Sequence, residues 1–138
     1  MIAASVIQTH IDNYPDFIRP SLQSAWDELS GFFLGAELDS GGRWEHGRCA
    51  WPEAYVKDVL SIWSRSDYVR ESCLRFPLWL QDWSEAESSL TTSKLPQQFR
   101  IDLQCLCQDA SDEATLMTVL RQNRRKEMTR IMWRDLLN

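Results

Sequence analysis

The chain has 138 residues, of which 43% are hydrophobic and 25% charged, with a formal net charge of −5 at pH 7 and seven tryptophans. This composition fits one folded domain and excludes a wholly disordered chain, and the acidic balance argues against a general nucleic-acid-binding protein. No apolar run reaches the roughly 18 to 20 residues that cross a bilayer, and no basic region precedes the apolar N-terminal residues. We therefore predict a cytoplasmic protein that binds neither membrane nor nucleic acid.

The first half of the chain shows apolar residues at steps of three and four, which is typical of amphipathic helices. Residues 1–14 are predicted to form a short helical lead-in, and a long helix is predicted from about Asp16 to Phe33. The segment 35–51 holds four of the five glycines and has no steady period. It is therefore expected to be the main loop.

The chain after residue 51 contains three prolines that fit the first turn of a helix, where the missing N–H group of proline leaves no hydrogen bond unmade. These are Pro52, Pro77 and Pro96. Ser64 or Ser66 is expected to cap a further helix. The polar, serine-rich segment 84–95 is expected to form a second loop.

The last helix is predicted to be the longest, with Asp109 or Ser111 as its cap and acidic residues in its first turn. No segment alternates convincingly as a strand, and no internal repeat is found. The predicted fold class is all-α, a single helical domain over residues 1–138 built as a bundle of five to seven helices with one long C-terminal helix.

The angle of 100° per residue predicts which residues share a face of that last helix. Leu116, Leu120 and Ile131 share one side and are predicted to face the core. Arg124 falls inside this stripe, and a buried arginine requires a carboxylate or carbonyl partner. We predict a partly buried Arg124 held by an ion pair or hydrogen bonds; in the alternative, its stem lies on the core and its guanidinium reaches water.

The opposite side of the same helix carries Trp133 and Leu137, and we expect them to form a surface that docks another domain together with Arg130 and Arg134. The simpler interpretation of the arginines is a solvated helix face. If the docking prediction holds, Trp133→Ala should leave the stability of the chain nearly unchanged. Leu120→Ala should then cost about 2 to 5 kcal/mol.

Side chains that could bind metal or catalyse proton transfer are sparse. The cysteines are dispersed, lack the spacing of a metal site and are expected to be reduced thiols: Cys49, Cys73, Cys105 and Cys107. The two histidines, His10 and His46, lie far apart in the sequence, so no acid–base pair can be assigned. We expect no metal, cofactor or catalytic residue in this chain.

The C-terminal run LRQNRRKEMTRIMWRDL, residues 120–136, resembles the N-terminal helical region of the glutamine synthetase adenylyltransferase/adenylyl-removing family. Further pieces match in the same order, namely SDYV at 66–69, RFP at 75–77 and SDE at 111–113. The resemblance covers residues 52–138 well and 15–51 weakly.

The resemblance implies that this chain corresponds to the region before the first nucleotidyltransferase domain of a longer enzyme. The glycine-rich turn and serine-aspartate-x-aspartate cluster of those domains do not occur in this sequence. We therefore expect a non-catalytic fragment that supports nucleotidyl transfer regulating nitrogen assimilation, with Mg²⁺ and ATP bound by the missing domains. The implied partners are the nucleotidyltransferase domain, glutamine synthetase and a P-II signalling protein. The alternative is a freestanding helical adaptor that binds a protein partner through exposed aromatic residues.

Overall fold

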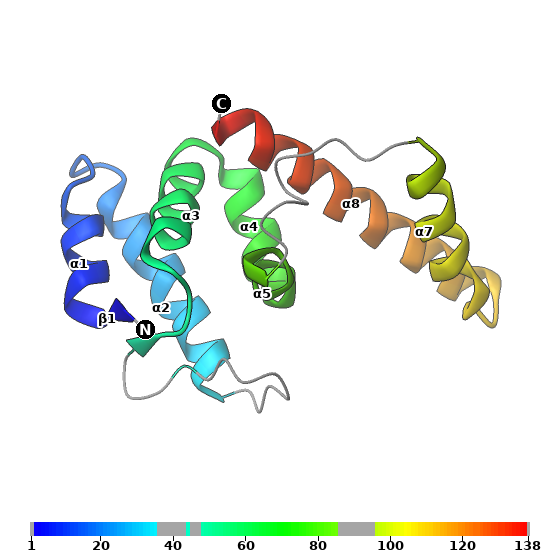
Figure 1. Cartoon of the computed structure of the whole chain (residues 1–138), viewed down its shortest axis with the longest axis horizontal. Helices are drawn as coiled ribbons and strands as arrows, with labels where there is room; N and C mark the ends of the chain where they lie inside the picture. Colours follow the sequence, from blue (N-terminus) through cyan, green and yellow to red (C-terminus); the bar gives the residue numbers. More distant parts are fainter. Residues whose placement is uncertain (1, 36–43, 45–47, 86–95, 138) are drawn as a thin grey trace.

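The computed structural model describes residues 2–35, 44, 48–85 and 96–137, which form seven helices and one pair of very short strands. The helices are α1 (Ala4–Asp12), α2 (Arg19–Gly35), α3 (Glu53–Arg65), α4 (Asp67–Arg75), α5 (Pro77–Glu85), α7 (Pro96–Gln108) and α8 (Glu113–Leu137). The strands β1 (Ile2–Ala3) and β2 (Arg48–Cys49) pair antiparallel. The predicted all-α fold with a long C-terminal helix is confirmed (Figure 1).

Local sequence signals place the helix starts well. α5 begins at Pro77, α7 begins at Pro96 and α3 begins directly after Pro52. Ser66 caps α4, because its Oγ accepts a hydrogen bond from the backbone N–H of Val69 at 3.3 Å. The two predicted loops, 35–51 and 84–95, lie largely outside the described residues, although α2 includes residue 35 and α5 extends to residue 85.

The cap of α8 differs from the prediction. The carboxylate of Asp112 accepts a hydrogen bond from the backbone N–H of Thr115 at 2.7 Å, so the cap is neither Asp109 nor Ser111. Hydrogen bonding from the Thr115 side chain, and then from its backbone N–H, lowers the pKa of the Asp112 carboxyl group. A carboxylate at this position satisfies one of the free N–H groups of the first turn and also complements the helix dipole.

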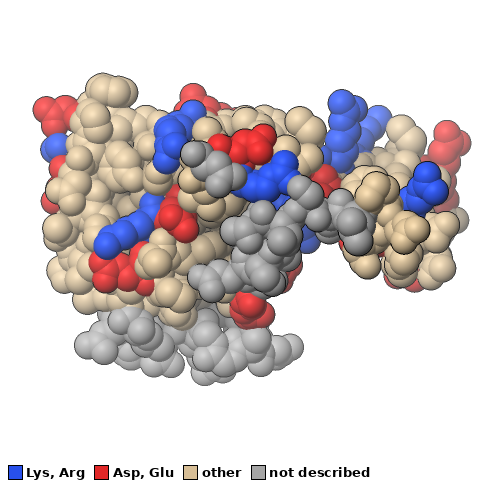
Figure 2. All heavy atoms as spheres, turned by 45° about the horizontal axis from the view of Figure 1, so that its top comes forward, with Lys and Arg blue, Asp and Glu red and all other residues tan. Residues whose placement is uncertain are grey.

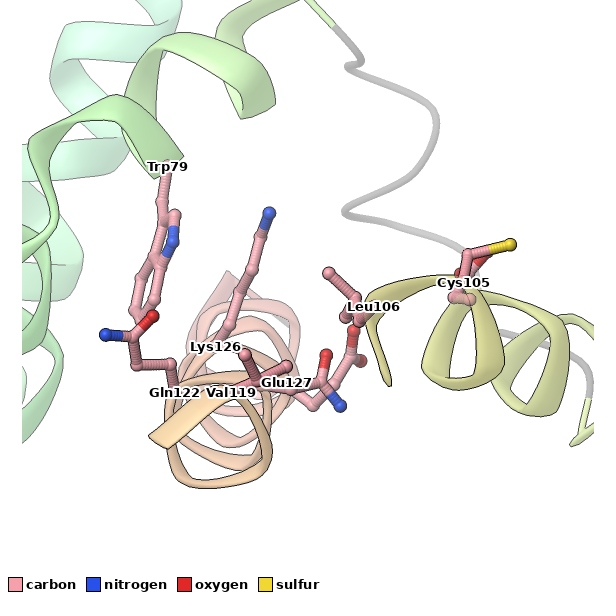
Figure 3. A pocket seen from close by; sticks show the side chains of 9 residues that line it. Trp79, Cys105, Leu106, Val119, Gln122, Lys126 and Glu127 are labelled. Carbon is pink, nitrogen blue, oxygen red and sulfur yellow. The ribbon is translucent and has the colours of Figure 1, made fainter. Parts of the chain in front are cut away.

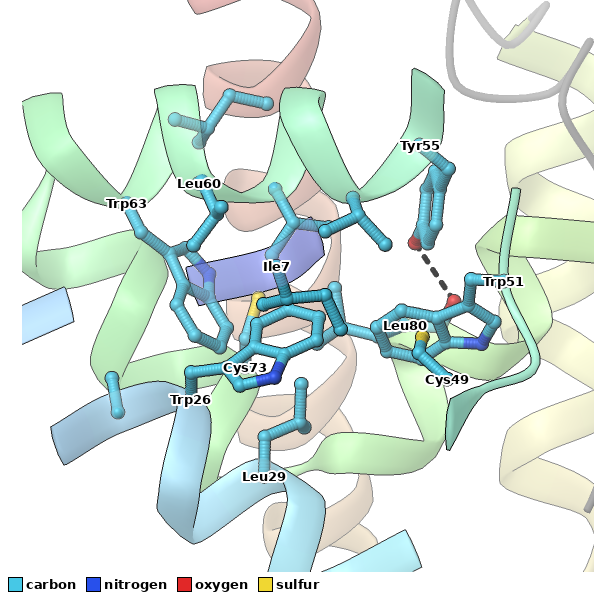
Figure 4. Close-up of a cluster of buried hydrophobic side chains, with 14 of the residues drawn as sticks. Ile7, Trp26, Leu29, Cys49, Trp51, Tyr55, Leu60, Trp63, Cys73 and Leu80 are labelled. Carbon is cyan, nitrogen blue, oxygen red and sulfur yellow. Dashed lines mark hydrogen bonds between the residues drawn. The ribbon is translucent and has the colours of Figure 1, made fainter. Parts of the chain in front are cut away.

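The hydrophobic core combines aliphatic side chains with aromatic rings, and most of the rings come from α2, α3 and the segment before α3 (Figure 4). The Trp26 ring lies 6.3 Å from Trp51 and 6.4 Å from Trp63, measured between centroids. The Tyr55 hydroxyl donates to the backbone carbonyl of Leu80 at 2.8 Å, which satisfies a polar group that is otherwise buried. The tryptophans thus fill the core.

The long helix α8 passes through two different environments. Its 25 residues extend about 37 Å. Its C-terminal half packs on α3 and α4, whereas its N-terminal half runs beside α7, away from the bundle (Figure 1). All buried residues of α8 lie at position 127 or later, and none of the residues of α7 is buried. The α7–α8 hairpin therefore forms a projecting arm with a large exposed surface.

Candidate functional site

The C-terminal half of α8 carries most of the residues that the sequence predicts to be functional, and the structure places Trp133 in the core. Its side chain is only 1% exposed. Its ring stacks on Tyr55 from α3 at 6.0 Å and lies 5.7 Å from the Trp83 ring of α5. The expectation that Trp133 faces away from the core is wrong, because the bundle packs on the side of α8 opposite to the stripe that contains Leu120 and Ile131.

Arg130 is also buried, being 6% exposed. Its Nε donates to Oε2 of Glu127 at 3.0 Å, and the two side chains are 8% and 11% exposed. A buried guanidinium requires such a charged partner, since an unpaired charge in the interior is strongly destabilising. Arg130 and Trp133 consequently have little surface left to offer another domain in this conformation.

Arg124, in contrast, is exposed. The prediction that it is partly buried and satisfied within the chain is wrong. Its neighbours at the same angle, Leu120 and Ile131, are only half-buried. The physical reason is that the apolar stripe containing Arg124 points away from the bundle. The buried ion pair of α8 exists, but it belongs to Arg130.

The last two predicted docking residues lie near the end of α8. Leu137 is 37% exposed, and half-buried Arg134 lies beside Asp135, with Nε and Oδ1 3.4 Å apart. This end of the helix is held by Arg65 of α3, whose Nη1 donates to the backbone carbonyl of Leu136 at 2.8 Å. A docking role for Leu137 and Arg134 stays a prediction.

A second anchor joins α8 to α4 and was not found from the sequence. The Arg125 Nε donates to Oγ of the buried Ser72 at 2.9 Å, and the Arg125 guanidinium lies 5.6 Å from the centroid of the Tyr68 ring. Arginine combines hydrogen bonding with stacking on an aromatic ring, so it can hold both groups at once. Because Ser72 and Arg125 are 53 positions apart, no local pattern links them.

A groove of about 490 Å³ lies where α5, α7 and α8 meet. Trp79 stands on one side, Leu106 stands on the other, and Lys126 rises between them from α8 (Figure 3). Asp102 and Glu127 also line the groove. It therefore presents an ammonium group together with two carboxylates, and its charge selects no single class of ligand.

The side chains that could react or bind metal do not gather at one place among the described residues. Burial raises the pKa of the Cys49 and Cys73 thiols to about 12, so both are protonated and unreactive at neutral pH. No group of three or more histidine, cysteine, aspartate or glutamate side chains among the described residues could hold a metal ion.

None of the described helices combines the length and the apolar character that a membrane span requires.

The surface offers little support for the adaptor alternative in its tryptophan-based form. Six of the seven tryptophans are buried and Trp79 is half-buried, although other rings such as Phe17 and Tyr68 are exposed. Cations and anions are interspersed over the face shown in Figure 2. That face lacks the extended basic field that accompanies general nucleic-acid binding.

Comparison with known proteins gives a family match and several similar relatives. The family model described as glutamate-ammonia ligase adenylyltransferase matches residues 56–138. Relatives are named bifunctional glutamine synthetase adenylyltransferase/adenylyl-removing enzyme. The one from Pseudomonas aeruginosa is 30% identical over 124 residues, covering 90% of this chain and 12% of the relative. That from Thioalkalivibrio sulfidiphilus is 31% identical over 126 residues, with 91% and 12% covered.

A third relative, from Nitrosococcus oceani, is 35% identical over 81 residues, which cover 59% of this chain and 8% of the relative. No solved structure gives a significant match. The chain thus spans only 8% to 12% of the length of the first curated relatives it matches. Because the family model covers more than half of the chain and relatives align along nine-tenths of it, the chain belongs to the glutamate-ammonia ligase adenylyltransferase family.

Proposed function

We propose that this chain is a non-catalytic helical module of a glutamine synthetase adenylyltransferase/adenylyl-removing enzyme. The family match over residues 56–138 is the observation that carries the proposal. In the enzyme, nucleotidyltransferase domains outside this sequence transfer AMP from ATP to glutamine synthetase and remove it again, with Mg²⁺ bound in those domains. Glutamine synthetase is then the substrate, a P-II protein is the regulatory partner, and the cytoplasm is the location.

Two features support a holding role for the module. The sequence has no serine-aspartate-x-aspartate cluster with which a nucleotidyltransferase would bind metal and nucleotide. The C-terminal half of α8 is fixed at several points, through the rings around Trp133, the Arg125–Ser72 bond and the Arg65–Leu136 bond. A helix held in this way provides a rigid support for whatever is joined to it.

A chimeric enzyme tests the proposal. The 124 residues that align in the Pseudomonas aeruginosa relative are replaced by this chain, and the adenylylation state of glutamine synthetase is followed by intact-protein mass spectrometry. We expect the chimera to attach and remove AMP, and the relative without its aligned region to lose one or both activities. We expect the isolated chain, with ATP and Mg²⁺, to do neither.

Variants of the chimera separate a structural role from a direct one. Trp133→Ala should reduce activity by destabilising the module, whereas Phe17→Ala, at a side chain 85% exposed, should leave activity unchanged. A folded but inactive chimera would contradict the proposed equivalence of the modules. Modification of glutamine synthetase by the isolated chain would contradict its non-catalytic role. The effect of a P-II protein on each enzyme form shows whether this partner acts through the module.

A further inference from the structure

The outer side of α8 carries an apolar stripe that the described structure covers only in part. We call it the outer stripe and define it as Met117, Leu120, Arg124, Met128 and Ile131. Met117 is 42% exposed and Met128 45% exposed, while Leu120 and Ile131 are half-buried. These are large, flexible or branched apolar side chains in a row, which is the composition of an adaptable protein-binding surface.

The spacing of the stripe is close to that of the seam of a helix pair. Met117, Arg124 and Ile131 are seven residues apart; Leu120 lies at the intervening seam position of the first heptad, and Met128 lies one residue after that of the second. Apolar residues at this spacing keep one face of a helix in register with a second helix. The distance from Met117 to Ile131 along the axis is about 21 Å, which about four turns of a facing helix would cover.

The charge of the stripe limits what can cover it. Arg124 lies at its middle, and Arg121 borders it; neither forms an ion pair or a hydrogen bond with its side chain within the described part of the chain. Covering Arg124 with an apolar surface would leave a desolvated, unpaired charge. A carboxylate opposite the guanidinium removes this penalty and adds paired hydrogen bonds.

A second copy of the chain does not fit the stripe. The stripe is symmetric about Arg124, with apolar residues on both sides at equal spacing. Pairing two copies in register, parallel or antiparallel, therefore brings Arg124 against its equivalent. Like charges facing one another across an interface are strongly unfavourable.

We propose that the outer stripe is the docking site of an acidic amphipathic helix from a protein partner. Aliphatic side chains of that helix contact Met117, Met128 and Ile131, and a carboxylate pairs with Arg124. The seam sets the register, and the single central charge selects the partner, as polar residues do at seam positions in coiled coils. This inference does not depend on which enzyme the module serves.

Two labelled synthetic helices, each about three heptads long, test the proposal with the full 138-residue chain. Both have leucine at the outer seam positions; one has glutamate at the central seam position and the other has lysine. Binding is measured by fluorescence anisotropy. The glutamate peptide should bind at least about tenfold more tightly than the lysine peptide.

The variant Arg124→Glu should reverse this preference, so that the lysine peptide becomes the tighter ligand. Lys57→Glu, at a side chain 54% exposed on α3, makes the same charge change elsewhere and should leave the preference unchanged. Circular dichroism checks that both variants fold. Failure of both peptides to bind, equal binding of the two, or an unaltered preference in Arg124→Glu overturns the proposal. So does sedimentation showing a dimer that Met128→Glu dissociates.

Discussion

Replacing Trp133 by alanine tests whether this side chain lies in the core, as the structure shows, or on the face of α8 turned away from the core, as helical periodicity predicts. A tryptophan buries about 150 to 250 Å². At about 25 cal/mol per Å² this corresponds to roughly 4 to 6 kcal/mol, part of which the alanine side chain and a compact unfolded chain retain. Since Trp133 is 1% exposed and contacts two rings, we expect Trp133→Ala to lower the free energy of unfolding by about 3 to 5 kcal/mol.

The loss would be a large part of the roughly 5 to 15 kcal/mol by which domains are stable, and should lower Tm by about 10 to 20 °C. Urea denaturation followed by far-ultraviolet circular dichroism measures it. Met128→Ala, at an exposed site on the same helix, is the control and should change stability by about 0.5 kcal/mol or less. A loss below about 1 kcal/mol for Trp133→Ala would mean that α8 does not pack on the bundle as described. Such a result would restore the docking role that the sequence predicts.

Three further predictions concern buried and paired groups. Glu127→Gln should destabilise the fold by about 1 to 3 kcal/mol, because it removes the carboxylate charge that the Nε of buried Arg130 binds. Replacing Glu127 and Arg130 together by apolar residues should cost less, and a double-mutant cycle measures the difference. A thiol reagent should modify Cys105 and Cys107 of α7 first and should reach the buried Cys49 and Cys73 only when the chain unfolds. The reason is that burial shields the Cys49 and Cys73 thiols and raises the pKa of both to about 12. Rapid reaction of all four cysteines in the folded chain would disprove this. Hydrogen bonds from His10 of α1 and Lys57 of α3 lower the pKa of the Glu53 carboxyl group in the folded chain. The Glu53 carboxylate therefore stabilises the fold at pH values above its ordinary pKa of about 4.3. This contribution disappears as the pH falls through the lower pKa of the folded chain. The difference in stability between the wild type and Glu53→Gln should therefore close on acidification below about pH 4.

The sequence by itself determined where the helices lie. Proline at residues 77 and 96 and serine at 66 act on the next few residues through fixed φ angles and side-chain hydrogen bonds, so their effects are legible without any knowledge of the fold. The same holds for the family, because the matching motifs are continuous stretches of chain. Even the basic run of α8 was correctly placed on one long helix.

Only the tertiary structure decided which face of α8 is buried. A single apolar angle describes a helix in one environment, but α8 lies against the bundle in one half and beside α7 in the other. The core side is set by rings far away in the sequence, Tyr55 and Trp83, which receive Trp133. Arg130 could enter the interior because Glu127 lies one turn before it, whereas Arg124 was left outside. Whether a residue is buried depends on which element packs against it, and the periodicity of the sequence does not specify that element.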